Sequence, residues 1–69
     1  MSIETYRGMT PKLGDKVFVH ASATIIGDVE LDDEVSIWPG VVIRGDVNSI
    51  RIGARTNVQD GSILHVTHK

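Results

Sequence analysis

The chain has 69 residues, a formal charge of −2 and no cysteine. This length allows at most one small domain, and the lack of cysteine excludes a disulfide framework and a thiolate zinc cluster, which fits a cytoplasmic protein. The seven Lys and Arg are dispersed and no apolar run approaches the length of a membrane span, so the sequence predicts neither a nucleic-acid nor a membrane partner.

Residues 1–12 precede any regular pattern, and we predict that they form an N-terminal arm. From residue 13 an aliphatic side chain recurs every six residues, and the series resumes after three additional residues. Its nine members are Leu13, Val19, Ile25, Leu31, Ile37, Ile43, Ile52, Val58 and Leu64. A second series of small or mostly β-branched residues lies two positions before them, from Val17 to Ser62.

Residues two apart point to the same side of an extended strand, so each six-residue unit is predicted to be a short strand followed by a turn. Gly, Asp and Asn recur between the strands, as in "LGDKV", "IGDVE" and "RGDVN", where bends and positive φ are needed. A helix would require apolar spacings of three and four, which are absent. The pattern therefore predicts an all-β solenoid, a parallel β-helix whose coils stack aliphatic residues in a central column.

The hexapeptide pattern, together with "IWPGVVIRGD" and "IGARTNVQDGSILHVTH", resembles the γ-class carbonic anhydrase family across residues 13–69. The resemblance implies a left-handed parallel β-helix of about three coils in this chain. It also implies a homotrimer with zinc at each subunit interface and the reversible hydration of carbon dioxide to bicarbonate. The family's other two histidine ligands would lie beyond residue 69, so we expect the chain to be truncated at its C-terminus.

The resemblance also implies roles for individual residues. His65 aligns with the family's first zinc-binding histidine, and Gln59 aligns with a residue that hydrogen-bonds the metal-bound water or the substrate. Asn57 aligns with a neighbour of that glutamine. Arg44 and Asp46 align with an ion pair that supports both the interface and the site.

A coil of this family comprises three hexapeptides, so residues 18 apart stack on one another. Arg44 and His65 are 21 apart, which is one coil plus the three additional residues, so we expect them on the same face in adjacent coils. Gln59 comes one hexapeptide before His65 and should lie on the neighbouring face. A site that needs both residues should therefore form between two chains.

Two other functions stay open. A hexapeptide-repeat acyltransferase would use a histidine as general base toward an acyl-coenzyme A thioester. A non-catalytic metal-binding or assembly subunit of the same fold is favoured by Val47, because certain active members of the family have an acidic residue there for proton handling.

Overall fold

The computed structural model describes residues 1–65, and the last residues of the predicted coils, including His68, lie outside that range. Eight strands follow one another along the chain. They are β1 (Ser2–Glu4), β2 (Lys12–Leu13), β3 (Phe18–Val19), β4 (Thr24–Leu31), β5 (Ser36–Ile37), β6 (Val42–Ile52), β7 (Asn57–Val58) and β8 (Ile63–His65).

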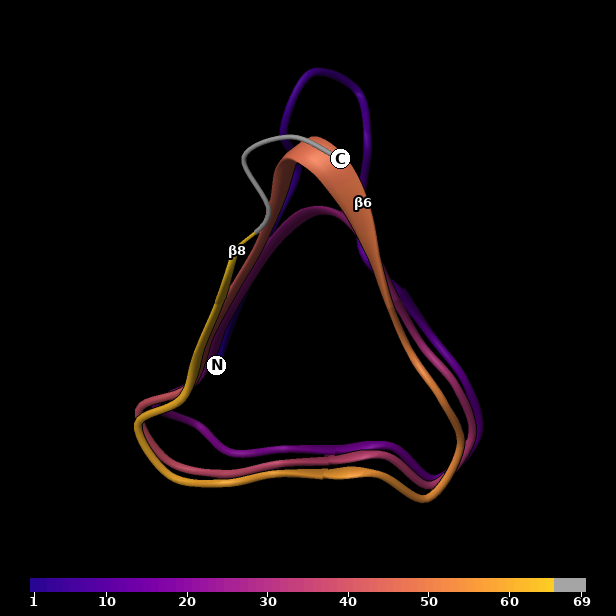
Figure 1. Cartoon of the computed structure of the whole chain (residues 1–69), viewed down its shortest axis with the longest axis vertical. Coiled ribbons are helices and arrows are strands. Elements are labelled where there is room, and N and C mark those ends of the chain that lie inside the picture. The colour runs from indigo at the N-terminus through magenta and orange to yellow at the C-terminus, as the bar shows by residue number, and fades with distance from the viewer. Residues whose placement is uncertain (66–69) are drawn as a thin grey trace.

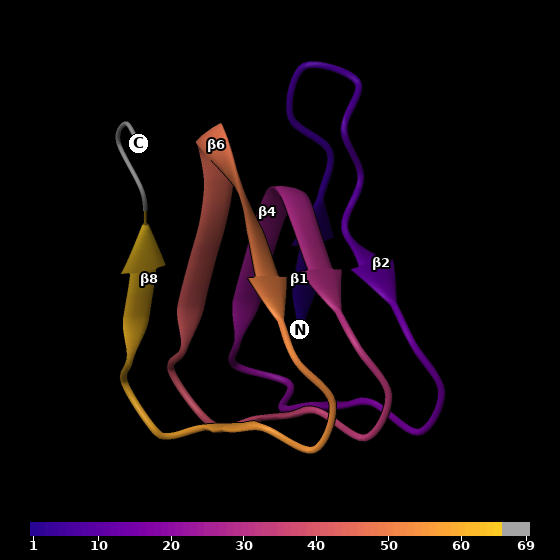
Figure 2. The ribbon, with the colours of Figure 1, turned by 45° about the vertical axis from the view of Figure 1, so that its right-hand side comes forward.

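The chain winds into a triangular coil in which every pair of named strands is parallel (Figure 1). The long strands β4 and β6 bend around a corner and contribute to two sides of the triangle (Figure 2). We call the three sides the β8 side (β1, the first halves of β4 and β6, and β8), the β2 side (β2 and the second halves of β4 and β6) and the β7 side (β3, β5 and β7).

The predicted aliphatic column fills the interior of the triangle. Ile25, Ile37 and Ile43 are fully buried, and the second series adds Ala23, Val29, Val35 and Val41 beside them. The first and last described coils have a described neighbour on one side, and there Leu13 is exposed and Val19 and Leu64 are only partly buried. The six-residue period therefore identifies the core, and burial is most complete in the middle coil.

The three additional residues are absorbed at one corner. Gly27 pairs with Gly45, 18 residues later, whereas Val29 pairs with Ile50, 21 residues later. The strand pairing is thus regular on both sides of the corner, and residues 46–49 bulge outward between them. This bulge places Asp46 and Val47 at the end of the β8 side.

The N-terminal segment adds to the first coil. Strand β1 pairs with β4, and the chain then reverses in a tight turn in which the backbone groups of Tyr6 and Met9 exchange two hydrogen bonds of 2.9 Å. Arg7 and Gly8 both have positive φ, which this turn requires. No helix long and apolar enough to cross a membrane is present in residues 1–65.

Replacing Ile37 with Asp tests the column. The side chain is fully buried among aliphatic residues, and an unpaired carboxylate there should cost more than ~3 kcal/mol of the free energy of unfolding. We expect the variant to lose cooperative unfolding in urea, followed by circular dichroism. Met9→Asp, at an exposed position, should unfold as the parent chain does, and a cooperative Ile37→Asp transition would contradict the assigned register.

Candidate functional site

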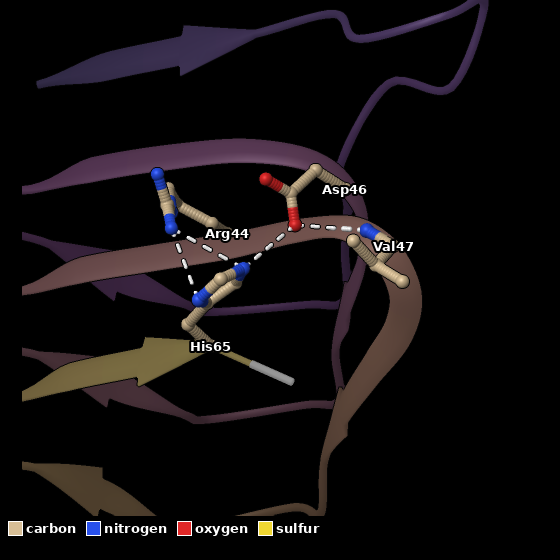
Figure 3. A network of polar contacts seen from close by, with 4 residues as sticks. All are labelled: Arg44, Asp46, Val47 and His65. Carbon is tan, nitrogen blue, oxygen red and sulfur yellow. Dashed lines mark hydrogen bonds and ion pairs between the residues drawn. The ribbon is translucent and has the colours of Figure 1, made fainter. Parts of the chain in front are cut away.

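The candidate ligand His65 lies on the outer surface of the β8 side. Strand β8 pairs with β6 so that Arg44 is directly opposite His65, as the spacing of 21 predicts. Each of the two follows an inward-pointing residue, Ile43 or Leu64, and therefore points outward. Asp46 reaches the same point from the end of this side, so two adjacent coils supply one polar cluster (Figure 3).

The imidazole of His65 contacts both charged residues. Its Nε2 lies 3.0 Å from Oδ1 of Asp46, and Arg44 Nη2 lies 3.0 Å from Nδ1 and 3.2 Å from Nε2. A carboxylate accepts hydrogen bonds only, so Nε2 carries the proton and donates to Asp46. With Nε2 protonated, only Nδ1 keeps a lone pair in the ring plane, and Arg44 Nη2, which lies almost equidistant from both nitrogens, contacts the ring as a whole.

The carboxylate of Asp46 also accepts a backbone hydrogen bond. The N–H of Val47 donates to Oδ1 at 2.8 Å, and this bond is the main reason that the pKa of Asp46 lies below its usual value. Partial desolvation opposes the shift, and His65 adds to it. Asp46 is therefore held ionised by its own chain and is oriented toward the imidazole.

Gly45, between Arg44 and Asp46, is required by packing. A Cβ atom at this position would overlap the carbonyl of Asp28 in the coil before it. In that coil Gly27 has φ +80°, and a Cβ there would lie 2.6 Å from the carbonyl oxygen of Gly45. The two glycines let the backbones of adjacent coils approach closely at the corner, and this contact sets the positions of the two flanking charged residues.

The other two predicted site residues lie elsewhere. Asn57 and Gln59 are exposed on the β7 side, where Asn57 pairs with Ser36 and the N–H of Trp38 donates to the carbonyl oxygen of Val58. The chain thus brings Arg44, Asp46 and His65 together and leaves the two amides on a neighbouring side. No direct Arg44–Asp46 ion pair occurs in the described part of the chain, and both side chains meet at His65 instead.

The backbone of Val47 is the part of the cluster that sequence reasoning missed. From the sequence, only the side chain of Val47 is informative, because certain active members of the resembled family have an acidic residue there. In the structure, it is the backbone N–H of Val47 that orients Asp46. The sequence offers one indication of this hydrogen bond, because Asp in turns tends to accept a bond from a nearby backbone N–H. This tendency does not specify which N–H is the donor.

Residues 1–65 do not provide a complete zinc site. Within residues 1–65, no three His, Asp or Glu side chains are grouped so that they could hold a metal ion. His65 and Asp46 are the two candidates at this point, and they are bonded to each other. A tetrahedral zinc site needs at least three protein donors, so the described coils supply part of one at most.

Gly45→Ala should disturb the cluster without changing any polar group. The added methyl must push β6 away from β4, at a cost of ~1–3 kcal/mol in the free energy of unfolding, and should break the His65–Asp46 hydrogen bond. Urea unfolding and the imidazole nitrogen shifts of His65 in NMR measure the two effects. Gly53→Ala is the matched control, because no heavy atom beyond its own chain neighbours lies within 4 Å of the position that its methyl would take; equal effects at both positions would refute the packing role.

The lowered pKa of Asp46 predicts a pH dependence. A carboxyl whose folded pKa is below its unfolded value of ~3.9 stabilises the fold above that value, and this contribution is lost as the pH falls through the folded pKa. Asp46→Asn keeps the shape and removes the ionisation. The difference in unfolding free energy between the parent and this variant should shrink from pH 6 toward pH 3 in urea titrations; a constant difference would contradict the assignment.

Comparisons with known proteins agree with the fold. The hexapeptide family described as "Bacterial transferase hexapeptide (six repeats)" matches residues 10–45, about half of the chain. The chain is 58% identical over 67 residues, 97% of its length, to "Protein YrdA" of Escherichia coli. It is 49% identical over 63 residues (91% of its length) to "Carbonic anhydrase" of Geobacillus kaustophilus and 49% identical over 57 residues (83%) to "Gamma carbonic anhydrase 2, mitochondrial" of Arabidopsis thaliana.

The chain spans 36%, 35% and 20% of the lengths of these three relatives, respectively. The triangular parallel coils, the hexapeptide match and these similarities together confirm the predicted fold and the resemblance seen in the motifs. The chain belongs to the hexapeptide-repeat family of left-handed parallel β-helix proteins, and within that family to the γ-carbonic-anhydrase-like group.

Proposed function

We propose that the chain forms the first coils of a γ-carbonic-anhydrase-like protein that, in its intact form, catalyses the zinc-dependent reversible hydration of carbon dioxide to bicarbonate. The observation that carries the proposal is the cluster of Arg44, Asp46 and His65 on adjacent coils, in a chain 49% identical to a protein named "Carbonic anhydrase". The cytoplasmic location predicted from the cysteine-free composition belongs to the same proposal.

His65 is the proposed metal ligand, and Asp46 is a positioning residue. A ligating histidine commonly donates its second ring N–H to a carboxylate, which fixes the tautomer and the orientation of the ring. Asp46 already makes such a contact with His65 at 3.0 Å. The remaining two zinc ligands would come from the longer protein, since the chain spans about a third of the bacterial relatives.

Gln59 and Asn57 are proposed to bind the small-molecule substrate. A carboxamide both donates and accepts hydrogen bonds, so Gln59 could donate to an oxygen of carbon dioxide or bicarbonate while accepting from a hydroxyl group. Both amides are on the β7 side, whereas His65 is on the β8 side. We propose that a site using all of them is built from two copies of the chain, within the homotrimer that the resemblance implies.

An acyltransferase is the second candidate, because the His65–Asp46 pair suits a general base. The carboxylate holds the proton on Nε2 and leaves the lone pair on Nδ1 to accept a proton. The description of the matched hexapeptide family also names transferases. Consumption of acetyl-coenzyme A in the presence of small amine or hydroxyl acceptors, lost in His65→Ala, would favour this function.

A non-catalytic subunit is the third possibility, since Val47 is exposed where an acidic group would handle protons.

A chimera tests the leading proposal. The chain replaces the 63 matching residues of the Geobacillus carbonic anhydrase, so that the remaining coils come from that protein. We expect one zinc per chain by metal analysis and hydration of carbon dioxide in a stopped-flow pH assay, because the chimera restores the missing ligands. His65→Ala should abolish both, and Gln59→Ala should lower the rate at least ~10² fold while retaining zinc.

This experiment has two controls. Arg51→Ala, on the β2 side, should leave zinc content and rate unchanged, since its side chain is 78% exposed and pairs with Glu30 rather than with a candidate site residue in the described part of the chain. The 69-residue chain alone should bind zinc weakly in equilibrium dialysis and show no hydration above background. A chimera that binds one zinc but retains it after His65→Ala would refute the assignment of the ligand.

A further inference from the structure

A pocket lies between the N-terminal turn and the bulge of β6. Tyr6, Arg7 and Met9 of the turn form one wall, and Asp28 of β4 and residues 45–49 form the other, around a volume of about 290 Å³. The turn projects beyond the corner at which β4 and β6 bend (Figure 1). The volume is close to the lower limit of about 300 Å³ for ligand pockets, so the pocket suits a small molecule.

The wall formed by the turn is held by its own hydrogen bonds. The backbone groups of Tyr6 and Met9 exchange two hydrogen bonds, and the hydroxyl oxygens of Thr5 and Thr10 lie 2.8 Å apart at the base of the turn. A Cβ atom on Gly27 would lie 3.3 Å from Cβ of Tyr6, so the turn also packs closely on β4. Both walls of the pocket are therefore ordered parts of the fold.

Arg7 is an unexpected residue for this turn. A two-residue turn with positive φ at both positions is usually built from Asn-Gly, because a long side chain makes positive φ costly. Arg7 nevertheless has φ +49°. The same conformation recurs at one corner of successive coils, at Lys16, Glu34 and Arg55, where the solenoid repeats it. Arg7 is outside that series, and an isolated residue in a strained conformation points to a function for its side chain.

The guanidinium of Arg7 and the carboxylate of Asp28 are available to a ligand. Arg7 Cζ lies 5.4 Å from the centroid of the Tyr6 ring, and a guanidinium stacked on a ring keeps its N–H edge available for a carboxylate. Neither Arg7 nor Asp28 forms an ion pair within residues 1–65. Asp46, the third charged group in the lining, already accepts two hydrogen bonds. The pocket thus offers one positive and one negative group on opposite walls.

The rest of the lining adds apolar and neutral polar surface. Met9 is 42% exposed and Val47 is 61% exposed, and both side chains line the pocket. Asn48 and Ser49 contribute groups that can donate and accept hydrogen bonds. Covering the exposed Met9 and Val47 is favourable, so the best ligand has an apolar group next to its charged groups.

We propose that this pocket binds a free α-amino acid with a small apolar side chain. The α-carboxylate binds Arg7 and the α-ammonium group binds Asp28. The ligand side chain packs on Met9 and Val47. An anion without an ammonium group is repelled by Asp28 and Asp46, and a cation without a carboxylate is repelled by Arg7. A zwitterion meets each wall with a complementary charge, and this binding does not depend on the proposed catalytic function.

Three ligands of similar shape test the charge requirement. L-leucine is the zwitterion, leucinamide lacks the carboxylate, and isocaproate lacks the ammonium group. In NMR titrations followed at the backbone amides of Gly8, Asn48 and Ser49, L-leucine should bind saturably with a Kd of about 1 mM or lower. Leucinamide and isocaproate should each bind at least ~10-fold more weakly. The titrations use both the 69-residue chain and the chimera described above.

Arg7→Asn separates binding from folding. Asparagine adopts positive φ more readily than arginine does, so the variant should be at least as stable in urea while its affinity for L-leucine falls at least ~10-fold. Arg55→Asn is the matched control, because it replaces an arginine at φ +61° outside the pocket, and it should bind L-leucine like the parent. Asp28→Asn should weaken L-leucine binding and strengthen isocaproate binding, since repulsion of the anion is reduced.

Three results would overturn the proposal. The first is a lack of saturable L-leucine binding by the parent, and the second is equal affinity for L-leucine and either analogue. The third is an equal loss of affinity in Arg7→Asn and Arg55→Asn, because the pocket would then not be the site. A chimera that binds L-leucine but does not hydrate carbon dioxide would refute the proposed function alone. An active chimera that does not bind L-leucine would refute the amino-acid site alone.

Discussion

Parallel pairing between successive coils is the interaction on which the rest of the structure depends. Each coil hydrogen-bonds to the coils before and after it, and this pairing places Ile25 on Ile43 and Ile43 on Leu64. The same register that stacks these aliphatic residues inside must stack their neighbours outside. Burial of the aliphatic column therefore fixes Arg44 opposite His65, so the packing of the core determines the geometry of the site.

The corner after Arg44 shows how the fold turns this regularity into a site. Regular strand pairing alone would stack equivalent outward-pointing residues, one from each of the three coils, in a row. The close approach of Gly45 to Asp28 and the outward bulge of residues 46–49 break that equivalence and bring Asp46 back toward the imidazole. The Arg-Gly-Asp sequence is therefore explained by geometry: two charged groups flank a residue that has no room for a side chain.

The sequence predicted the repeat, the buried residues and the opposition of Arg44 and His65, because all three follow from a period that burial enforces. The period also placed Gln59 on a different side from His65. It did not predict the bond from the Val47 backbone to Asp46 or the overlap that excludes a side chain at Gly45, since both depend on the path of a corner where the period is interrupted. Exposure of Leu13 at the end of the stack likewise reflects position rather than residue type.

The bulge at residues 46–49 has a consequence for how such a protein can change. The pairing offset rises from 18 to 21 across it and is then constant through Ile52, so the change in length is confined to one corner. A corner of this kind can gain, lose or exchange residues while the aliphatic column keeps its register. Variation in the chemistry beside His65 is thereby decoupled from the stability of the solenoid, and new activities can arise at this corner on an unchanged scaffold.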